Sequence, residues 1–198
     1  MKTMQMHVSV LAIMVSLFLA PSVSDAQTQF GIRAGLNAST ISFKNLPNKA
    51  EKFGYHVGVF ADVPISPGFV SIQPEIGYST KGTTFKPGND RKTLNLNYVD
   101  LFIPVAFKLS MFDLQVGPFA SYMTSKPDYT YYSDNKVYLN GFKKYDVGLT
   151  GGLTMNINKL MIGLRYNQGF VDITQDNARA VLGSGKNAVG QVSVGYKF

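Results

Sequence analysis

Apolar and polar residues alternate one by one through most of the chain after residue 29. In the final segment, 187–198, one face carries Val192, Val194, Tyr196 and Phe198, and the other carries small or polar residues. A period of two residues predicts a β-strand with two chemically different faces. An apolar strand left at an open sheet edge promotes aggregation. We therefore expect the last strand to pair with the first and close the sheet into a barrel.

The same alternation predicts eight strands joined by connections that are alternately long and short. The predicted strands span residues 30–39, 53–62, 69–80, 94–109, 113–123, 143–156, 159–170 and 187–198. The long connections span residues 40–52, 81–93, 124–142 and 171–186, and the short turns lie at 63–68, 110–112 and 156–159. Outer-membrane barrels have an even strand number, short turns on one side and long loops on the other. This sorting favours an up-and-down transmembrane barrel over a soluble barrel.

The two faces of the predicted strands differ in charge. One face is almost uncharged, and the other carries Arg33, His56, Glu75, Asp100, Lys108, Asp146, Arg165 and Lys197. In lipid the uncharged face must point outward, because a Lys or Arg there costs about 2–4 kcal/mol near the midplane. An eight-stranded barrel has internal room only for side chains, and buried charges need partners. We expect a polar network that plugs the lumen.

Composition sets the class of protein. The chain is 45% apolar with a mean hydropathy of +0.01, and it has no apolar run of 18 residues outside its first segment, which excludes a helical membrane protein. Residues 1–26 have the features of a signal peptide: Lys2, an apolar stretch at 8–20, and small residues Ser24 and Ala26 before the cleavage site. The barrel domain then spans 27–198. The absence of cysteine excludes disulfides and a thiolate nucleophile.

Seven short motifs, in this order and spacing, resemble the PorT-like outer-membrane β-barrel family of Gram-negative bacteria. The motifs are Phe30–Asn37, Tyr55–Phe60, Ile72–Tyr78, Val99–Val105, Gly117–Phe119, Tyr145–Gly148 and Gly195–Phe198. The resemblance covers nearly the whole mature chain. It implies an eight-stranded outer-membrane barrel without catalytic residues, and an accessory role in protein secretion is implied by the resemblance alone. We also expect Val194, Tyr196 and Phe198 to serve as the assembly signal for the barrel assembly machinery.

Candidate chemistry is sparse. His56 is the one histidine of the mature chain, so a metal site is not expected, and no glycine pattern precedes a helix as a phosphate loop would. A Ser71–His56–Glu75 cluster would be the only hydrolase arrangement available to an outer-membrane lipid-modifying enzyme. The preferred interpretation is that His56 is part of the polar packing of the lumen. No cofactor is expected.

The formal net charge is +7, and the basic residues gather in or near the predicted long connections. These residues are Lys44, Lys49, Lys52, Lys81, Lys86, Arg91, Lys92, Lys143 and Lys144. Cations at that level attract anionic lipid head groups, so we expect contacts with outer-membrane lipid and lipopolysaccharide and none with nucleic acid. The tyrosines of 124–142 suit either an interfacial girdle or a surface for a protein partner.

These observations predict an outer-membrane barrel with a structural or interaction role, exerted through its external loops or within a membrane complex. The alternatives are a narrow pore, a barrel that binds a small ligand, and the lipid-modifying enzyme.

Overall fold

The computed structural model describes residues 27–43, 49–85, 92–125, 128–130, 136–138, 143–174 and 184–198. The predicted signal peptide, 1–26, lies outside the described residues, as do parts of every predicted long connection. Among the residues that are described, no helix is both long enough and apolar enough to cross a membrane.

The described chain folds into β-strands of two kinds. The long strands are β1 (Gln29–Phe43), β3 (Lys52–Ser66), β5 (Glu75–Phe85), β6 (Lys92–Phe102), β8 (Phe112–Met123), β11 (Tyr145–Ile157), β12 (Leu160–Gly169) and β13 (Gly185–Lys197). The shorter strands are β2 (Lys49–Ala50), β4 (Val70–Ile72), β7 (Val105–Leu109), β9 (Asp128–Thr130) and β10 (Lys136–Tyr138).

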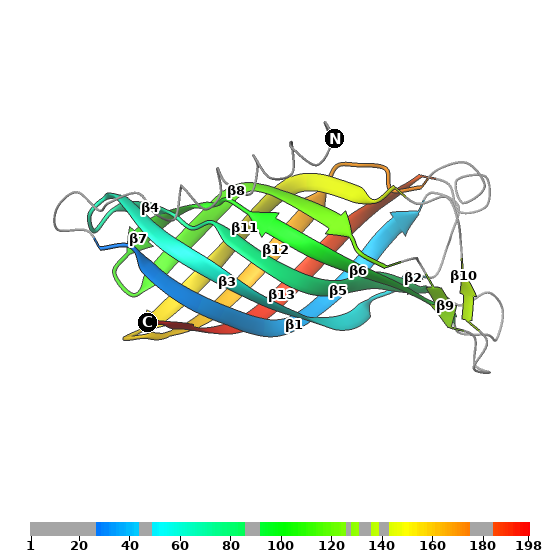
Figure 1. The fold of residues 1–198 in the computed structure, drawn as a ribbon, viewed down its shortest axis with the longest axis horizontal. Helices are drawn as coiled ribbons and strands as arrows, with labels where there is room; N and C mark the ends of the chain where they lie inside the picture. Colours follow the sequence, from blue (N-terminus) through cyan, green and yellow to red (C-terminus); the bar gives the residue numbers. More distant parts are fainter. Residues whose placement is uncertain are drawn as a thin grey trace, which may run out of the picture.

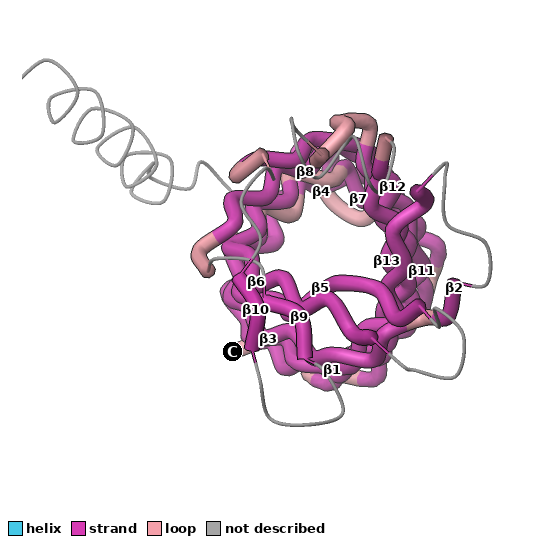
Figure 2. Tube along the Cα trace, turned by 90° about the vertical axis from the view of Figure 1, so that its right-hand side faces the viewer, coloured by secondary structure: helices cyan, strands magenta, loops and turns pink. Residues whose placement is uncertain are grey.

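The sheet closes on itself as predicted. β13 pairs antiparallel with β1, from Gly31 opposite Lys197 to Phe43 opposite Gly185, and Phe198 donates its N–H to the carbonyl of Phe30 at 2.9 Å. β1 also pairs with β3, so both edges of the first strand are occupied. Each strand of the wall runs antiparallel to its neighbours, and the end-on view shows a closed ring (Figure 2).

The structure divides this sheet into thirteen strands, where the sequence predicted eight. Two predicted strands are interrupted, at Gln73–Pro74 between β4 and β5 and at Ile103–Pro104 between β6 and β7. Proline has no N–H to donate, so it interrupts a strand ladder. The breaks are adjacent, because the Gln73 N–H donates to the carbonyl of Pro104 at 2.9 Å. The remaining additional strands, β2, β9 and β10, lie within the predicted long connections.

The two ends of the barrel differ. At the short-turn end, two-residue turns at Ser110–Met111 and Asn158–Lys159 join neighbouring strands, and their first residues have positive φ values of 56° and 57°. The chain also ends there (Figure 1). At the opposite, long-loop end, β1 runs on to Phe43 and β5 to Phe85. The predicted connections 40–52 and 81–93 were therefore drawn too long, since each begins with strand.

On β6, apolar and polar side chains exchange faces along the length of the strand. In the part of β6 near the long-loop end, Leu94 and Leu96 are fully buried and Asn97 points outward. Further along the same strand, Val99 is exposed on the outer wall and Asp100 is buried inside. In its long-loop part, β6 thus resembles a strand of a soluble barrel, with apolar side chains inside and polar ones outside. The remainder is built as lipid requires.

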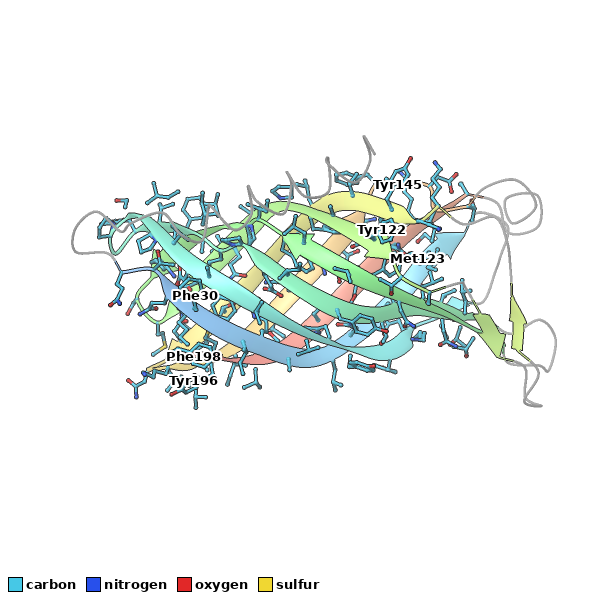
Figure 3. All side chains as sticks on the ribbon, in the orientation of Figure 1. Phe30, Tyr122, Met123, Tyr145, Tyr196 and Phe198 are labelled. Atoms are coloured by element: carbon cyan, nitrogen blue, oxygen red, sulfur yellow. The ribbon has the colours of Figure 1, made fainter. Side chains whose placement is uncertain are left out.

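Outward-facing aromatic side chains form a belt near each end of the apolar wall. Phe30, Tyr196 and Phe198 lie near the short-turn end, and Tyr122 and Tyr145 lie toward the long-loop end (Figure 3). Aromatic girdles flank the apolar band of membrane barrels at both interfaces. Between the belts, outward side chains such as Leu101 and Ile162 belong to the uncharged face that the sequence predicted.

Candidate functional site

The interior of the barrel holds several charged residues, which form separate clusters. Every residue of the predicted lumen set faces inward. Relative exposure is 8% or less for Arg33, His56, Glu75, Asp100, Asp146, Arg165 and Lys197, and the Lys108 side chain is 22% exposed. Alternation places these side chains inside because each lies an even number of residues from another inward position on its strand.

The central cluster consists of Glu75 from β5 between two guanidinium groups. Arg165 donates to both carboxylate oxygens, with Nη1–Oε1 at 3.1 Å and Nη2–Oε2 at 2.7 Å, and Arg33 Nη1 donates to Oε2 at 3.0 Å. Each guanidinium also stacks on an aromatic ring, Arg165 over Phe102 at 4.6 Å and Arg33 over Phe60 at 5.3 Å. Paired contacts of this type are the strongest hydrogen bonds that side chains form. This cluster joins β1, β5 and β12 across the lumen.

The inner cluster lies toward the short-turn end. Asp62 accepts from Lys108 at 2.7 Å and from Lys197 at 3.1 Å, and Asp113 accepts from Lys108 at 3.0 Å. Gln73, beside the proline break, donates to Asp113 at 3.4 Å. Asp62 and Asp113 were absent from the predicted set because each stands at the end of a predicted strand. Their inward parity was the signal available in the sequence.

The outer cluster lies nearer the long-loop end. Lys81 Nζ donates to Asp100 Oδ1 at 2.7 Å and to Ser121 Oγ at 3.0 Å, and both Ser79 and Ser121 donate to Asp100. The ammonium group of Lys81 also lies 4.8 Å from the ring centroid of Tyr98. The prediction that Lys81 belongs to an external loop is wrong, because β5 continues through it and Lys81 is only 1% exposed.

Uncharged polar groups form a further chain of hydrogen bonds in the interior. His56 Nδ1 and Gln191 Nε2 both contact Asn37 Oδ1, at 2.7 and 2.9 Å. Asn167 donates to Gln191 at 3.0 Å and Thr150 donates to Asn167 at 2.6 Å. The histidine therefore belongs to a hydrogen-bonded chain that crosses β3, β1, β13, β12 and β11. Separately, Asp146 accepts from Asn187 at 2.8 Å.

An apolar cap occupies the interior at the long-loop end. Its members are Ile41, Leu94, Leu96, Tyr98, Met123, Ile173 and Val189, each at most 4% exposed. Ile173 comes from the connection after β12 and is held by two backbone bonds. Lys143 donates its N–H to the Ile173 carbonyl at 2.8 Å, and Ile173 donates to Gly185 at 2.9 Å. The predicted long connection 171–186 thus contributes a residue to the barrel interior.

The hydrolase arrangement is not assembled. Ser71 on β4 is paired with Pro64 of β3, eight residues along that strand from His56. Eight residues of strand span about 26 Å, which is far beyond hydrogen-bonding reach. Glu75 is engaged by Arg33 and Arg165. Across the described ranges, no group of three or more His, Asp or Glu residues is arranged to hold a metal ion.

The structure describes only some of the basic residues that were predicted in or near the long connections. Lys44, Lys86 and Arg91 lie outside the described residues, as do the side chains of Lys49 and Lys92. Lys144 and Lys186 are exposed at the long-loop end. The tyrosine side chains within 124–142 also lie outside the described residues, so their expected role stays a prediction. The predicted assembly residues Val194, Tyr196 and Phe198 are exposed on the outer wall.

Comparison with known proteins identifies the same architecture. The attachment invasion locus protein Ail of Yersinia pestis, in complex with the heparin analogue sucrose octasulfate, matches 87% of this chain and 99% of its own with a TM-score of 0.53 and 11% identity. Neisserial surface protein A matches 87% of this chain and 99% of its own with a TM-score of 0.51 and 12% identity. At such identities the likeness shows the fold alone. No curated protein matches the sequence.

A family model gives the assignment. The model described as "outer membrane protein beta-barrel domain" matches residues 24–175, well over half of the chain. It agrees with the closed sheet, the uncharged outer wall between two aromatic belts, and the charged interior. The chain belongs to the outer membrane protein beta-barrel domain family and is an outer-membrane β-barrel.

Proposed function

We propose that this protein is a closed, non-conducting barrel that anchors an external interaction surface in the outer membrane. The observation that carries the proposal is the burial of inward side chains along the whole axis. Residues of the inner cluster, the central cluster, the outer cluster and the apolar cap are nearly inaccessible, apart from Lys108 at 22% exposure. A continuous water-filled passage would leave inward side chains of every such layer exposed to solvent. This burial supports a lumen that is plugged by its own side chains.

The ion pairs make this plug rigid. Removing one partner of a buried pair costs roughly 3–5 kcal/mol, because an uncompensated charge remains. The central cluster joins strands that are distant around the barrel, such as β5 with β12 in the Glu75–Arg165 pair. Opening a path for solutes would require breaking several such contacts together. This favours the structural role over the narrow pore and over a barrel with an internal ligand cavity.

The proposal includes eight membrane crossings. β4 and β5 both pair with β3, and β6 and β7 both pair with β8. Each of these pairs of strands occupies one position in the ring, so it counts as a single crossing interrupted by proline. The other crossings are β1, β3, β8, β11, β12 and β13. The chain reaches the membrane through its signal peptide, residues 1–26, and is inserted by the barrel assembly machinery.

The interaction surface lies at the long-loop end, which faces outward from the cell because outer-membrane barrels carry their longer loops there. The polar exterior near Asn97 lifts this end clear of the hydrocarbon. The connections that follow β1, β5, β8 and β12 are joined to it. The contacts proposed for it are lipopolysaccharide and a protein partner in a membrane complex. Within this proposal, membership of the PorT-like group and an accessory role in secretion rest on the sequence motifs.

Current recording across planar bilayers tests the closed lumen. The full chain, refolded in detergent and shown to insert, is expected to produce no stepwise conductance. The triple variant Arg33→Ala/Glu75→Ala/Arg165→Ala removes the central cluster alone and is also expected to stay closed, because the inner cluster, the outer cluster and the apolar cap remain. Long-lived channels of uniform size from the unmodified chain would establish the narrow pore instead.

A further inference from the structure

The outer wall of the barrel contains an apolar groove of about 680 Å³ that crosses β11, β12, β13 and β1. These strands are neighbours in the wall (Figure 1). One row of paired outward residues runs through the groove: Gly151, Tyr166, Gly190, Ala38 and Phe53. The large rings of Tyr166 and Phe53 stand on either side of the small residues Gly190 and Ala38. The next row, Leu153, Leu164, Val192 and Leu36, forms an apolar continuation.

Two glycines of this groove, Gly190 and Gly151, have no steric reason to be glycine. A Cβ added at Gly190 would meet only the Ala38 carbonyl oxygen, at 3.8 Å, and one added at Gly151 would meet only the Gln115 carbonyl oxygen, at 3.9 Å. Neither residue has a positive φ. By contrast, a Cβ at Gly148 would lie 2.0 Å from the Gln168 carbonyl oxygen. Glycine weakens a strand interior and often marks the close approach of a ligand. The space above Gly190 and Gly151 is therefore open to an occupant from outside the barrel.

A cation, Lys186, lies on the same strand and face as Gly190, toward the long-loop end. Lys186, Ala188 and Gly190 follow one another on the outer face of β13, and Lys186 is exposed beside Ser42 of β1. Four residues of strand place Lys186 about 13 Å from Gly190. With the tilt of about 35–45° typical of membrane barrels, Lys186 lies at head-group level when Gly190 lies in the hydrocarbon. An exposed lysine at that level attracts the phosphate of an anionic lipid.

We infer that this groove binds one acyl chain of a phosphate-bearing lipid of the outer leaflet, with the lipid phosphate at Lys186. The wall lies in the membrane, so an acyl chain is the occupant already at hand. An acyl chain gains no hydrophobic free energy by moving from the surrounding lipid into the groove, because both surroundings are apolar. Specificity must come instead from close packing between Tyr166 and Phe53 and from the charge above. The inference depends on the orientation in the membrane and not on the closed lumen, so conductance does not bear on it.

Native mass spectrometry tests this site. The full chain is reconstituted in phosphatidylethanolamine vesicles containing lipid A, a phosphorylated, multiply acylated disaccharide, and the lipid retained after mild detergent extraction is measured. Gly190→Val fills the groove and is expected to retain about tenfold less lipid A. Lys186→Gln is expected to retain about fivefold less lipid A, with retention of phosphatidylethanolamine unchanged.

The matched control is Ala120→Val, an outward position on β8 outside the groove, which should retain lipid A as the unmodified chain does. Valine favours strands, so Gly190→Val is expected to fold, and heat-modifiable gel migration verifies this. Unchanged lipid A retention in folded Gly190→Val would overturn the site. Conversion of a dimer to a monomer by Gly190→Val, without loss of lipid A, would also overturn it, because the groove would then seat a second copy of the chain.

Discussion

Replacing Glu75 with glutamine is the sharpest test of the buried interior. Glutamine has nearly the shape of glutamate but no charge, so the substitution leaves the guanidinium groups of Arg33 and Arg165 without a counterion. Both are inaccessible to water, at 4% and 8% exposure, and their contacts to Glu75 measure 2.7–3.1 Å. Breaking one partner of such a buried arrangement costs roughly 3–5 kcal/mol.

Urea titration of the refolded protein in detergent micelles measures the effect. The chain contains no tryptophan, so circular dichroism and heat-modifiable gel migration report unfolding. With a urea dependence of roughly 2 kcal/mol per molar, the predicted loss lowers the unfolding midpoint of Glu75→Gln by about 2 M. The control Glu51→Gln alters an exposed acid and is expected to change the free energy of unfolding by less than about 0.5 kcal/mol.

A third variant separates charge from shape. Replacing the whole cluster, as Arg33→Met/Glu75→Leu/Arg165→Met, removes every charge together. Buried ionic clusters replaced by apolar groups of similar volume often lose no stability. We expect this variant to be at least about 2 kcal/mol more stable than Glu75→Gln alone. A midpoint for Glu75→Gln equal to that of Glu51→Gln would refute the argument, since Glu75 would then have no energetic role in the lumen.

Two further substitutions test the position of the membrane and the path of β5. Leu101→Lys puts a charge on the lipid-facing wall and is expected to lower the free energy of unfolding in vesicles by about 2–4 kcal/mol. Asn97→Lys lies beyond the apolar band on the same strand and is expected to change the free energy of unfolding by about 0–1 kcal/mol. Equal effects of the two substitutions in the same urea titration would contradict the assigned boundary. Gly82→Ala is expected to lower the unfolding midpoint, because Gly82 has a φ of 147° and an added Cβ would lie against the Leu94 carbonyl oxygen. A midpoint unchanged in Gly82→Ala would show that this backbone can relax.

Alternation alone was sufficient to predict the closed sheet and the inward direction of residues such as Glu75 and Arg165. A one-residue slip would reverse every side chain of a strand, so parity is strongly specified wherever the two environments differ. The pairing partners within the lumen could not be predicted in this way. Glu75 and Arg165 are 90 residues apart, and their contact depends on barrel curvature and strand stagger.

The wrong predictions occurred where the surroundings of a strand or its hydrogen bonding change along its length. Lys81 has the same parity as Glu75, but the polar residues after it resemble a loop, although the strand simply leaves the lipid there. Pro74 and Pro104 were included within continuous predicted strands although each breaks a ladder. The groove at Gly190 also escaped prediction, because it appears only when residues from neighbouring strands are aligned in register.

The reversal of face chemistry on β6 fixes how far the barrel can sink into its bilayer. Shifting the barrel toward the cell interior by one residue pair would place Asn97 among acyl chains, and shifting it away from the cell would expose Val99 to water. A membrane thicker than the apolar band must therefore thin around the protein, at a fraction of a kcal/mol per Å of hydrophobic mismatch. The bacterial outer membrane is thinner than average, which reduces this penalty, so the same boundary that lifts the loops clear of the surface also suits the protein to a thin bilayer.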